Sequence, residues 1–324
     1  MTNDESRGAN NSSSLILHPS SLIVIVGPTA VGKTETAIRL AEYIDGEIVS
    51  ADSRQVYRGM DIGTAKPTPD QRARVPHHLI DVADPDEVLS LAQYQSAAYA
   101  AIDDIFSRGR QPLLVGGTGL YIKAVTEGLR IPAVPPDPAL RTELEARAER
   151  EGQLALYAEL RQVDPAAAAR INPRNVRRTI RALEVYRLSG RRFSELGQVQ
   201  PPPYRVIIFG LTLPRPDLYA RIDARVDAMI AAGLVEETRR LAKKYNWSLP
   251  SMSGLGYRQI GMFLRGECSE AEAMAAIKRE TRRFVRRQAN WFRPSDSRIT
   301  WFDMRFEIDR DLLSTLQRET DAIE

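Results

Sequence analysis

The residues best suited to do chemistry form one octapeptide near the start of the chain. It consists of Gly27, Pro28, Thr29, Ala30, Val31, Gly32, Lys33 and Thr34. The pattern G-x-x-x-x-G-K-T is typical of a loop whose backbone amides curl around a phosphate, with the lysine adding a full positive charge and the threonine hydroxyl placed to ligate Mg²⁺. The sequence therefore predicts a site for a diphosphate or a triphosphate, and the motif alone does not say which.

Three further side chains are candidates for the same site. Asp52 and Thr118 each follow a short apolar segment, at 47–50 and at 112–115. Because ligands of open α/β sheets bind where the strands end, we expect both beside the phosphate loop, with Asp52 as a general base or as a magnesium ligand acting through water. Arg225 has no acid three or four residues away, so its charge is available to an anion elsewhere.

These candidates must be positioned by alternating strands and helices. The apolar, β-branched segment 22–26 predicts a buried strand directly before the loop, and 35–43 has a helical pattern directly after it. Further strands are expected at 47–50, 112–115 and 205–211, and helices at 91–107, 218–245 and 271–292. The alternation predicts an α/β fold, with a parallel sheet like that of P-loop NTPases.

Two proline clusters, at 132–138 and 200–203, mark a boundary on each side of a segment with helical patterns only. We therefore expect an all-helical insertion domain within the α/β core. The expected divisions are a disordered tail at 1–20, a core at 21–134 and 200–308, the insertion at 135–199 and a C-terminal tail at 309–324.

Composition excludes several classes of protein. Of the 324 residues, 43% are hydrophobic and 27% are charged, as in ordinary soluble proteins. The longest run of branched aliphatic residues is 22–26, which is far too short to cross a membrane. The lone cysteine, Cys268, cannot form an internal disulfide or a cysteine-based zinc site, which favours a reducing, cytoplasmic setting. A monomer is expected, because no surplus apolar helix calls for a partner.

Positive charge is concentrated in two segments of a chain whose net charge is only +3. Residues 170–192 contain eight arginines and one acid, and residues 278–298 contain eight basic residues and two acids. This segregation favours a polyanionic partner, with nucleic acid first. The alternative is a pair of solvated, salt-bridged helix faces, and that interpretation needs acids at i±4, which the two segments lack.

Together with the phosphate loop, several longer motifs resemble the bacterial tRNA dimethylallyltransferases. The resemblance is most specific at 52–67, which reads DSRQVYRGMDIGTAKP, and at 116–121, which reads GGTGLY. Residues 76–78, 178–184, 256–259 and 281–288 fit the same family in the same order. The resemblance covers about residues 20–305, and it fits the shorter bacterial form, because one cysteine excludes a two-cysteine zinc finger.

The resemblance implies transfer of a dimethylallyl group from dimethylallyl diphosphate to N6 of the adenosine at position 37, 3′ to the anticodon, in tRNAs that read codons starting with U. Lys33, the loop amides, Arg225 and Mg²⁺ on Thr34 would neutralise the leaving diphosphate. Asp52 would accept the N6 proton, and Thr118 would lie near the reacting groups.

The same resemblance implies contacts with the anticodon stem-loop. The flipped base and its neighbours would meet Asp52, Ser53, Arg54, Gln55 and Thr118. Further RNA contacts are implied at Arg177, Arg178, Arg181, Gly256, Tyr257, Arg258, Thr281, Arg282, Arg283, Arg286, Arg287 and Gln288. His77 and His78 have structural or RNA-contacting roles that the sequence leaves open.

Three other functions explain part of the sequence. A P-loop nucleotide kinase or NTPase would account for residues 27–34 but not for the two basic segments. An isopentenyltransferase acting on free AMP would share the chemistry without needing an RNA-binding insertion. An RNA-binding protein with an inactive phosphate loop would not need Lys33, Thr34 and Asp52 to be intact. ATP is expected to bind the loop weakly and not to be turned over.

Overall fold

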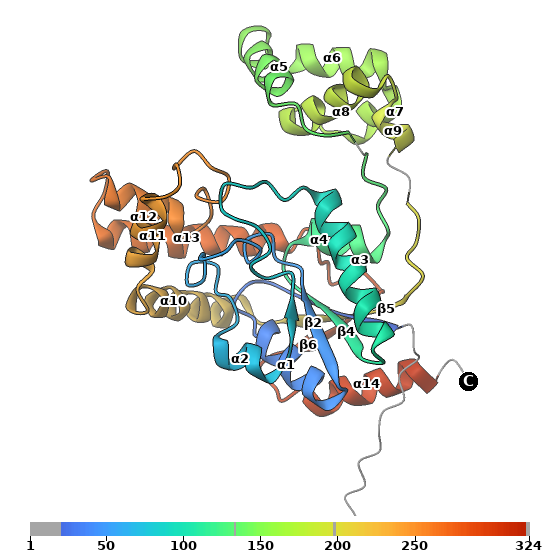
Figure 1. The fold of residues 1–324 in the computed structure, drawn as a ribbon, viewed down its shortest axis with the longest axis vertical. Coiled ribbons are helices and arrows are strands. Elements are labelled where there is room, and N and C mark those ends of the chain that lie inside the picture. Colours follow the sequence, from blue (N-terminus) through green and yellow to red (C-terminus); the bar gives the residue numbers. More distant parts are fainter. Residues whose placement is uncertain (1–20, 133, 197–198, 322–324) are drawn as a thin grey trace, which may run out of the picture. The chain divides into compact units, whose positions relative to one another are not determined.

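The fold is built on one six-stranded parallel sheet. The computed structural model describes residues 21–132, 134–196 and 199–321, so the tail expected at 1–20 lies outside the described residues. The strands are β1 (Ser21–Val26), β2 (Gly46–Ser50), β3 (His77–His78), β4 (Gln111–Val115), β5 (Arg205–Thr212) and β6 (Ile299–Asp303). They lie in the order β3-β2-β4-β1-β5-β6, and every pair is parallel, which confirms the α/β prediction (Figure 1).

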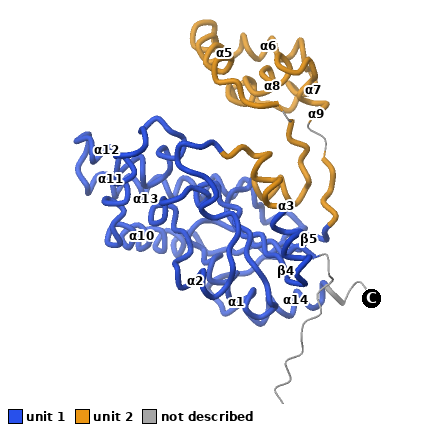
Figure 2. The backbone as a smooth tube through the Cα atoms, in the orientation of Figure 1, with its two compact units in different colours: residues 1–88, 100–119, 204–324 blue, residues 89–99, 120–203 orange. Residues whose placement is uncertain are grey.

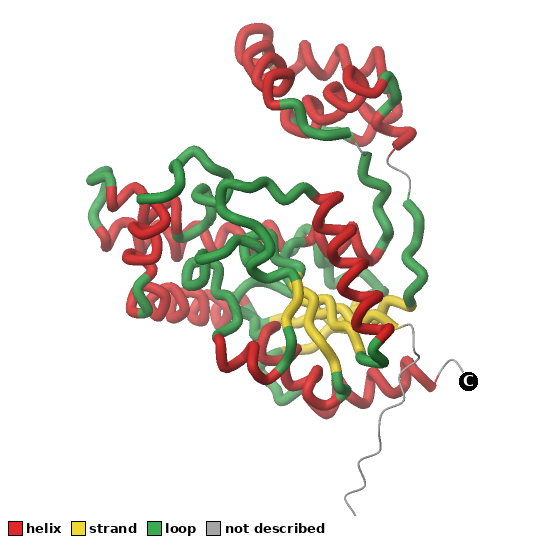
Figure 3. Tube along the Cα trace, viewed as in Figure 1, coloured by secondary structure: helices red, strands yellow, loops and turns green. Residues whose placement is uncertain are grey.

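Fourteen helices are found in the described residues. Those that accompany the sheet are α1 (Lys33–Tyr43), α2 (Pro69–Arg74), α3 (Leu91–Ser107), α4 (Gly119–Thr126), α10 (Arg215–Ala231), α11 (Leu234–Ala242), α12 (Tyr257–Leu264), α13 (Glu270–Gln288) and α14 (Asp309–Asp321). Those of the inserted segment are α5 (Pro138–Glu151), α6 (Gln153–Val163), α7 (Pro165–Arg170), α8 (Val176–Ser189) and α9 (Phe193–Leu196). Figure 3 shows that this inserted segment contains helices and loops only, as predicted.

β1 lies inside the sheet, and its residues are buried on both faces. All six residues of β1 are buried, as expected for a strand covered on both faces. Ile23 and Ile25 pack with Ala37 and Ile38 of α1 and with Phe209 of β5 in one apolar cluster. The phosphate loop between β1 and α1 is thus anchored at both ends in the most buried part of the molecule.

The helix predicted at 218–245 is two helices. The chain breaks between α10 and α11 at Gly233, whose φ is +100°, a left-handed conformation that glycine adopts without steric cost. The amphipathic pattern continues across the break, because Val226 and Leu234 are both buried. The periodicity of the apolar residues could not reveal the turn.

The prediction of a C-terminal tail at 309–324 is wrong for residues 309–321, which are helical. These form α14, which packs on α1. Its Leu312 and Leu316 are 2% and 0% exposed and belong to the apolar cluster around β1. The preceding strand, β6, was also not predicted, because 299–303 alternates only briefly in polarity.

The chain divides into two compact units, at residues different from those expected (Figure 2). One unit comprises residues 1–88, 100–119 and 204–324, and the other comprises 89–99 and 120–203. The compact units thus divide at 119/120 and 203/204, whereas the sequence predicts boundaries at 134/135 and 199/200. The second unit contains the first part of α3 and nearly all of α4 together with the insertion. The rings of Tyr94, in α3, and Tyr121, in α4, stack with their centroids 3.6 Å apart.

Within the second unit, the helices α5–α9 have an apolar core of their own. Leu144, Leu156, Leu160 and Leu183 are fully buried there. In the part of the chain that the structure describes, no helix is long and apolar enough to cross a membrane.

Shortening Leu316 to alanine should destabilise the first unit by about 2–5 kcal/mol, because a fully buried leucine leaves a cavity when truncated. Urea unfolding followed by circular dichroism measures this. Gln317→Ala, at an exposed position on the same helix, is the control and should change stability by less than about 0.5 kcal/mol. An unchanged unfolding midpoint for Leu316→Ala would mean that α14 does not dock.

Candidate active site

The phosphate loop has the backbone that its sequence predicts. Gly27 and Gly32 have φ values of +144° and +116°, which side-chain-bearing residues rarely adopt. A Cβ atom on Gly27 would lie 2.5 Å from the carbonyl oxygen of Leu211, so only glycine fits beside β5. Lys33 Nζ donates to the carbonyl oxygens of Gly27 (3.1 Å) and Pro28 (2.8 Å), which folds the lysine over the loop.

Two cations meet one carboxylate at this loop. Burial and the nearby Arg225 lower the pKa of Lys33 to about 8, although the Asp52 carboxylate opposes the shift. Burial also lowers the pKa of Arg225. Arg225 Nη1 donates to Thr29 Oγ1 at 3.3 Å, so α10 delivers its charge to the phosphate loop. The site holds more positive than negative charge in a poorly solvated place, which is the electrostatic condition for binding an anion.

Arg221 is a site residue that the sequence analysis did not select. Its Nη1 donates to the carbonyl oxygen of Val31 at 3.1 Å, and its side chain lines the same cavity as Arg225. The signal was available in the sequence, because Arg221 lies one helical turn before Arg225 and therefore on the same face of α10.

The loops after β2 and β4 bring Asp52 and Thr118 together, as expected. Asp52 Oδ1 accepts a hydrogen bond from the Arg54 amide at 2.8 Å, and Thr118 Oγ1 accepts one from the Ser53 amide at 3.0 Å. The backbone of the two loops also touches, since the Thr118 amide donates to the Ala51 carbonyl oxygen at 3.2 Å. A Cβ atom on Gly116 would lie 2.1 Å from that same oxygen, which explains the glycine.

Gln288 of α13 joins the two halves of the site. Its Oε1 accepts from the Thr29 amide at 2.9 Å, and its Nε2 donates to the Gly117 carbonyl oxygen at 3.0 Å. The residue is only 4% exposed. Both of its polar atoms position the phosphate loop against the loop that carries Thr118, and the RNA contact that the resemblance implies for Gln288 stays a prediction.

Tyr257 and Gly256, for which the resemblance also implies an RNA contact, are buried. The Tyr257 hydroxyl donates to Glu237 Oε1 at 2.6 Å. The Glu237 carboxylate in turn accepts from three consecutive amides, those of Asp61, Ile62 and Gly63. Burial and the Glu237 carboxylate raise the pKa of Tyr257. These bonds attach the long 52–90 loop to α11 and α12.

The same loop is held from inside by a buried lysine. Lys66 Nζ, on a side chain 1% exposed, bonds to Asp61 (2.7 Å), to Asp81 (2.5 Å) and to the carbonyl oxygen of Tyr57 (2.5 Å). Gln55 Nε2 donates to the carbonyl oxygen of Ala65 at 3.1 Å, and Gln55 Oε1 accepts from Ser50 Oγ at 3.2 Å. Gln55 is thus fixed within its loop while it lines the cavity.

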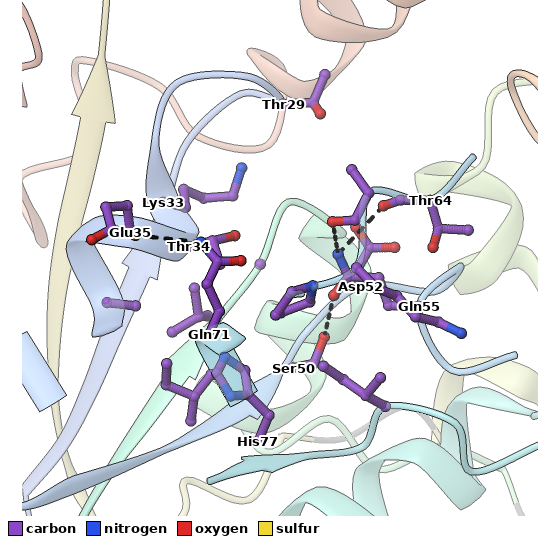
Figure 4. Close-up of a pocket in the computed structure, with 18 of the residues that line it drawn as sticks. Thr29, Lys33, Thr34, Glu35, Ser50, Asp52, Gln55, Thr64, Gln71 and His77 are labelled. Carbon is purple, nitrogen blue, oxygen red and sulfur yellow. Dashed lines mark hydrogen bonds between the residues drawn. The ribbon is translucent and has the colours of Figure 1, made fainter. Parts of the chain in front are cut away.

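A cavity of about 380 Å³ opens between these loops. Figure 4 shows Lys33 and Thr34 of the phosphate loop on one side of this cavity and the strand-end residues Asp52 and Ser50 on the other. The Thr34 hydroxyl and the Asp52 carboxylate line the same space. Since Mg²⁺ is usually held by one or two protein oxygens together with substrate phosphates, this donor set fits magnesium that arrives with a diphosphate.

The two histidines have different surroundings. His78 Nε2 bonds to Glu47 Oε2 at 2.7 Å, and Arg108 and Arg110 also bind that buried carboxylate, whose pKa they hold far below its usual range. His77 lines the cavity, and its Nδ1–H donates to the Val75 carbonyl oxygen at 2.7 Å. In the described residues, no cluster of three or more His, Cys, Asp or Glu side chains could hold a metal ion.

The basic segments are more neutralised than the sequence indicated, because their acid partners come largely from other helices. Arg187 pairs with Glu143 and Glu159, Lys278 with Asp227, and Arg282 with Asp223. Within α13, Glu280 pairs with Arg283 three residues away, a spacing that the argument from i±4 did not cover.

Arg181 is likewise engaged within the protein. It bonds to the fully buried Glu184 (2.6 Å) and to the carbonyl oxygen of Val134 (2.9 Å), and the RNA contact expected for it stays a prediction. Other expected RNA contacts remain accessible. Those with exposed side chains are Arg177, Arg178, Arg258, Arg283, Arg286 and Arg287, while Ser53, Arg54, Thr281 and Arg282 are partly exposed.

Comparison with known proteins agrees with this geometry. The family model described as IPP transferase matches residues 55–295. The tRNA dimethylallyltransferase of Roseiflexus sp. (strain RS-1) is 61% identical over 273 residues, which are 84% of this chain and 90% of that protein. The tRNA dimethylallyltransferase of Thermomicrobium roseum is 54% identical over 284 residues, covering 87% of this chain and 86% of that protein.

Solved structures give the same result. The crystal structure of a tRNA isopentenylpyrophosphate transferase from Bacillus halodurans has a TM-score of 0.69 at 42% identity, covering 94% of this chain and 99% of that one. A eukaryotic dimethylallyltransferase acting on tRNA has a TM-score of 0.75 at 26% identity, covering 88% of this chain and 74% of that one.

The lowered pKa of Lys33 predicts how anion binding depends on pH. A lysine with a pKa of about 8 is charged at pH 7 and largely neutral at pH 9, so it must take up a proton before pairing with an anion. The affinity for inorganic diphosphate should therefore fall as the pH rises from 7 to 9. Isothermal titration calorimetry across this range measures it.

Lys33→Arg is the matched control, because the guanidinium keeps its charge throughout. Titration of the diphosphate itself is common to both proteins, so the difference between them isolates Lys33. Equal pH profiles for the two proteins would contradict the lowered pKa.

Proposed function

Because the chain belongs to the IPP transferase family, we propose that it transfers a dimethylallyl group from dimethylallyl diphosphate to N6 of adenosine 37, 3′ to the anticodon, in tRNAs that read codons starting with U. One observation carries this proposal: a phosphate-binding loop and the strand-end carboxylate Asp52 line a single cavity. A donor diphosphate and an acceptor amine can therefore meet there. The protein is proposed to act as a monomer in the cytosol.

The transfer must be assisted at two places, the leaving diphosphate and the acceptor amine. The bond between C1 of the dimethylallyl group and the diphosphate oxygen breaks, and the diphosphate leaves with the electron pair. Lys33, Arg225 and the loop amides face the developing negative charge, and they are fixed in place before the substrate arrives. Mg²⁺ held by Thr34 and the substrate phosphates would supply further neutralisation of that charge.

At the other end, N6 of adenine forms the new bond to C1 and loses a proton. Its lone pair is delocalised into the ring, so the amine is a weak nucleophile and benefits from a base. Asp52 Oδ1 already accepts the Arg54 amide, which orients the carboxylate and leaves Oδ2 for the proton. Thr118, bonded to the Ser53 amide, fixes the loop beside it.

The alternatives fit less well. The two relatives described above are tRNA dimethylallyltransferases at 61% and 54% identity, which favours the proposed function over a nucleotide kinase or NTPase. An enzyme acting on free AMP would not need the exposed arginines of α8. Incubation with labelled dimethylallyl diphosphate, Mg²⁺ and an unmodified anticodon stem-loop, with AMP and ATP as parallel acceptors, distinguishes these functions. Label on the stem-loop alone is expected, and label on AMP alone would overturn the proposal.

Asp52→Asn should reduce the rate of transfer by about 10²–10⁴-fold, the usual contribution of a general base. Binding of inorganic diphosphate should be retained, because the phosphate loop is unchanged. Single-turnover transfer and calorimetry measure the two quantities. Asp86→Asn, at an exposed position of the following loop, should leave both unchanged. Full activity in Asp52→Asn would remove the base from the mechanism.

The exposed arginines of α8 should bind RNA phosphates. No hydrogen bond or ion pair of the Arg177 and Arg178 guanidinium groups is found with any described residue. Replacing both with alanine should weaken stem-loop binding and lower the slope of log K against log salt by roughly 0.7–0.9 for each phosphate that is no longer neutralised. Fluorescence anisotropy at several salt concentrations tests this.

Arg318→Ala, on α14, is the control and should keep the slope of the unmodified protein. An unchanged slope in the double variant would show that α8 does not touch the phosphates.

A further inference from the structure

An exposed tryptophan follows the last turn of α13. Trp291 keeps 49% of its surface accessible, although tryptophan is among the most buried residue types on average. The side chain is nevertheless firmly seated. A Cβ atom on Gly119 would lie 2.3 Å from Trp291 Cγ, so one side of the indole packs directly against the Gly119 backbone.

The position of Trp291 is coupled to the site. Gly119 follows Thr118 directly, so the indole marks the rim of the loop that carries Thr118. The Trp291 amide donates to the Gln288 carbonyl oxygen at 2.9 Å, and the Gln288 side chain holds Thr29 and Gly117. The tryptophan is therefore presented at a fixed place beside the phosphate loop.

Two arginines flank the indole in the sequence. Arg287 lies one helical turn before Trp291, and Arg293 lies two residues after it; both are exposed. Neither guanidinium has a hydrogen-bond or ion-pair partner among residues 21–132, 134–196 and 199–321, whereas nearby Arg283 and Arg298 pair with Glu280 and Asp296. An exposed aromatic ring with two such arginines close by in the sequence matches a single-stranded nucleic acid, which presents bases and phosphates together, better than it matches an apolar protein surface.

We propose that Trp291 stacks on an unpaired base of the RNA acceptor next to the adenosine that enters the cavity, with Arg287 and Arg293 binding the adjoining phosphates. This inference rests on the proposed function and adds a residue that holds the loop open beside the reacting base. Every base has a flat aromatic face, so the contact contributes affinity for an unpaired loop and does not select a sequence.

The first test uses the fluorescence of Trp291 itself. The chain contains three tryptophans, so Trp247→Phe with Trp301→Phe leaves Trp291 as the only one. The anticodon stem-loop should quench its emission, because a stacked base quenches indole. A stem-loop with an abasic site at position 36 or at position 38 should still bind by anisotropy, and one of the two should restore the emission. Equal quenching by both abasic RNAs and the intact RNA would overturn the proposal.

The second test is kinetic and does not depend on the double variant folding. Trp291→Leu should raise KM for the stem-loop by about 5- to 150-fold, the range measured for losing one base–aromatic stack. The rate constant kcat and the affinity for inorganic diphosphate should stay the same. Trp291→Phe should recover most of the loss, because it keeps an aromatic ring. A purely structural role would change diphosphate affinity or melting temperature along with KM.

Tyr43→Leu is the matched control, since Tyr43 is 57% exposed at the end of α1 farthest from the phosphate loop, and its KM should equal that of the unmodified protein. The two proposals fail separately. No transfer to the stem-loop by the unmodified protein would refute the proposed function. Normal transfer together with an unchanged KM in Trp291→Leu would refute the stacking contact alone.

Discussion

Lys33 and Arg225 place two positive charges, and Asp52 one negative charge, around a poorly solvated cavity. The surrounding structure keeps this excess of positive charge in place. Burial and the neighbouring Arg225 lower the pKa of Lys33, because a positive charge is unfavourable at this place when no anion is bound. Without an anion, the lysine satisfies itself on two carbonyl oxygens of its own loop, which are weak partners for a full charge. A diphosphate is a better partner, so the free energy held in this unbalanced site becomes available when the donor binds.

The residues that create and position this excess of positive charge come from elements that are far apart in the sequence. α10 contributes Arg225 and Arg221, the loops after β2 and β4 contribute Asp52 and Thr118, and the side-chain amide of Gln288 fastens the phosphate loop to the second of these loops. The long 52–90 segment has little regular structure, yet the buried Lys66 and Glu237 give it polar anchors on two sides. Its order comes from these ion and amide contacts more than from an apolar core.

The sequence predicted the parts of this arrangement that local physics determines. The strand at 22–26 and the phosphate loop were correct, because apolar residues and glycines act there within a few positions. Partners that depend on folding were not predictable. The resemblance implied an RNA contact for Gln288, and only the fold reveals the two backbone groups that its side chain bonds. The ion pair of Arg181 was not predictable for a similar reason, since Glu184 becomes buried only when α5 packs against α8.

The chain enters and leaves its helical insertion through a single narrow stem. Leu129 and Val199 form an antiparallel bridge, and the Gln200 amide donates to the Gly128 carbonyl oxygen at 2.9 Å. These contacts offset the entropic cost of bringing the two ends of the insertion together, and that cost grows only slowly with the length of the segment between them. Evolution can therefore lengthen, shorten or exchange the segment between 129 and 199 as a module, and a short turn grafted across the stem would leave the catalytic sheet a continuous, closed chain.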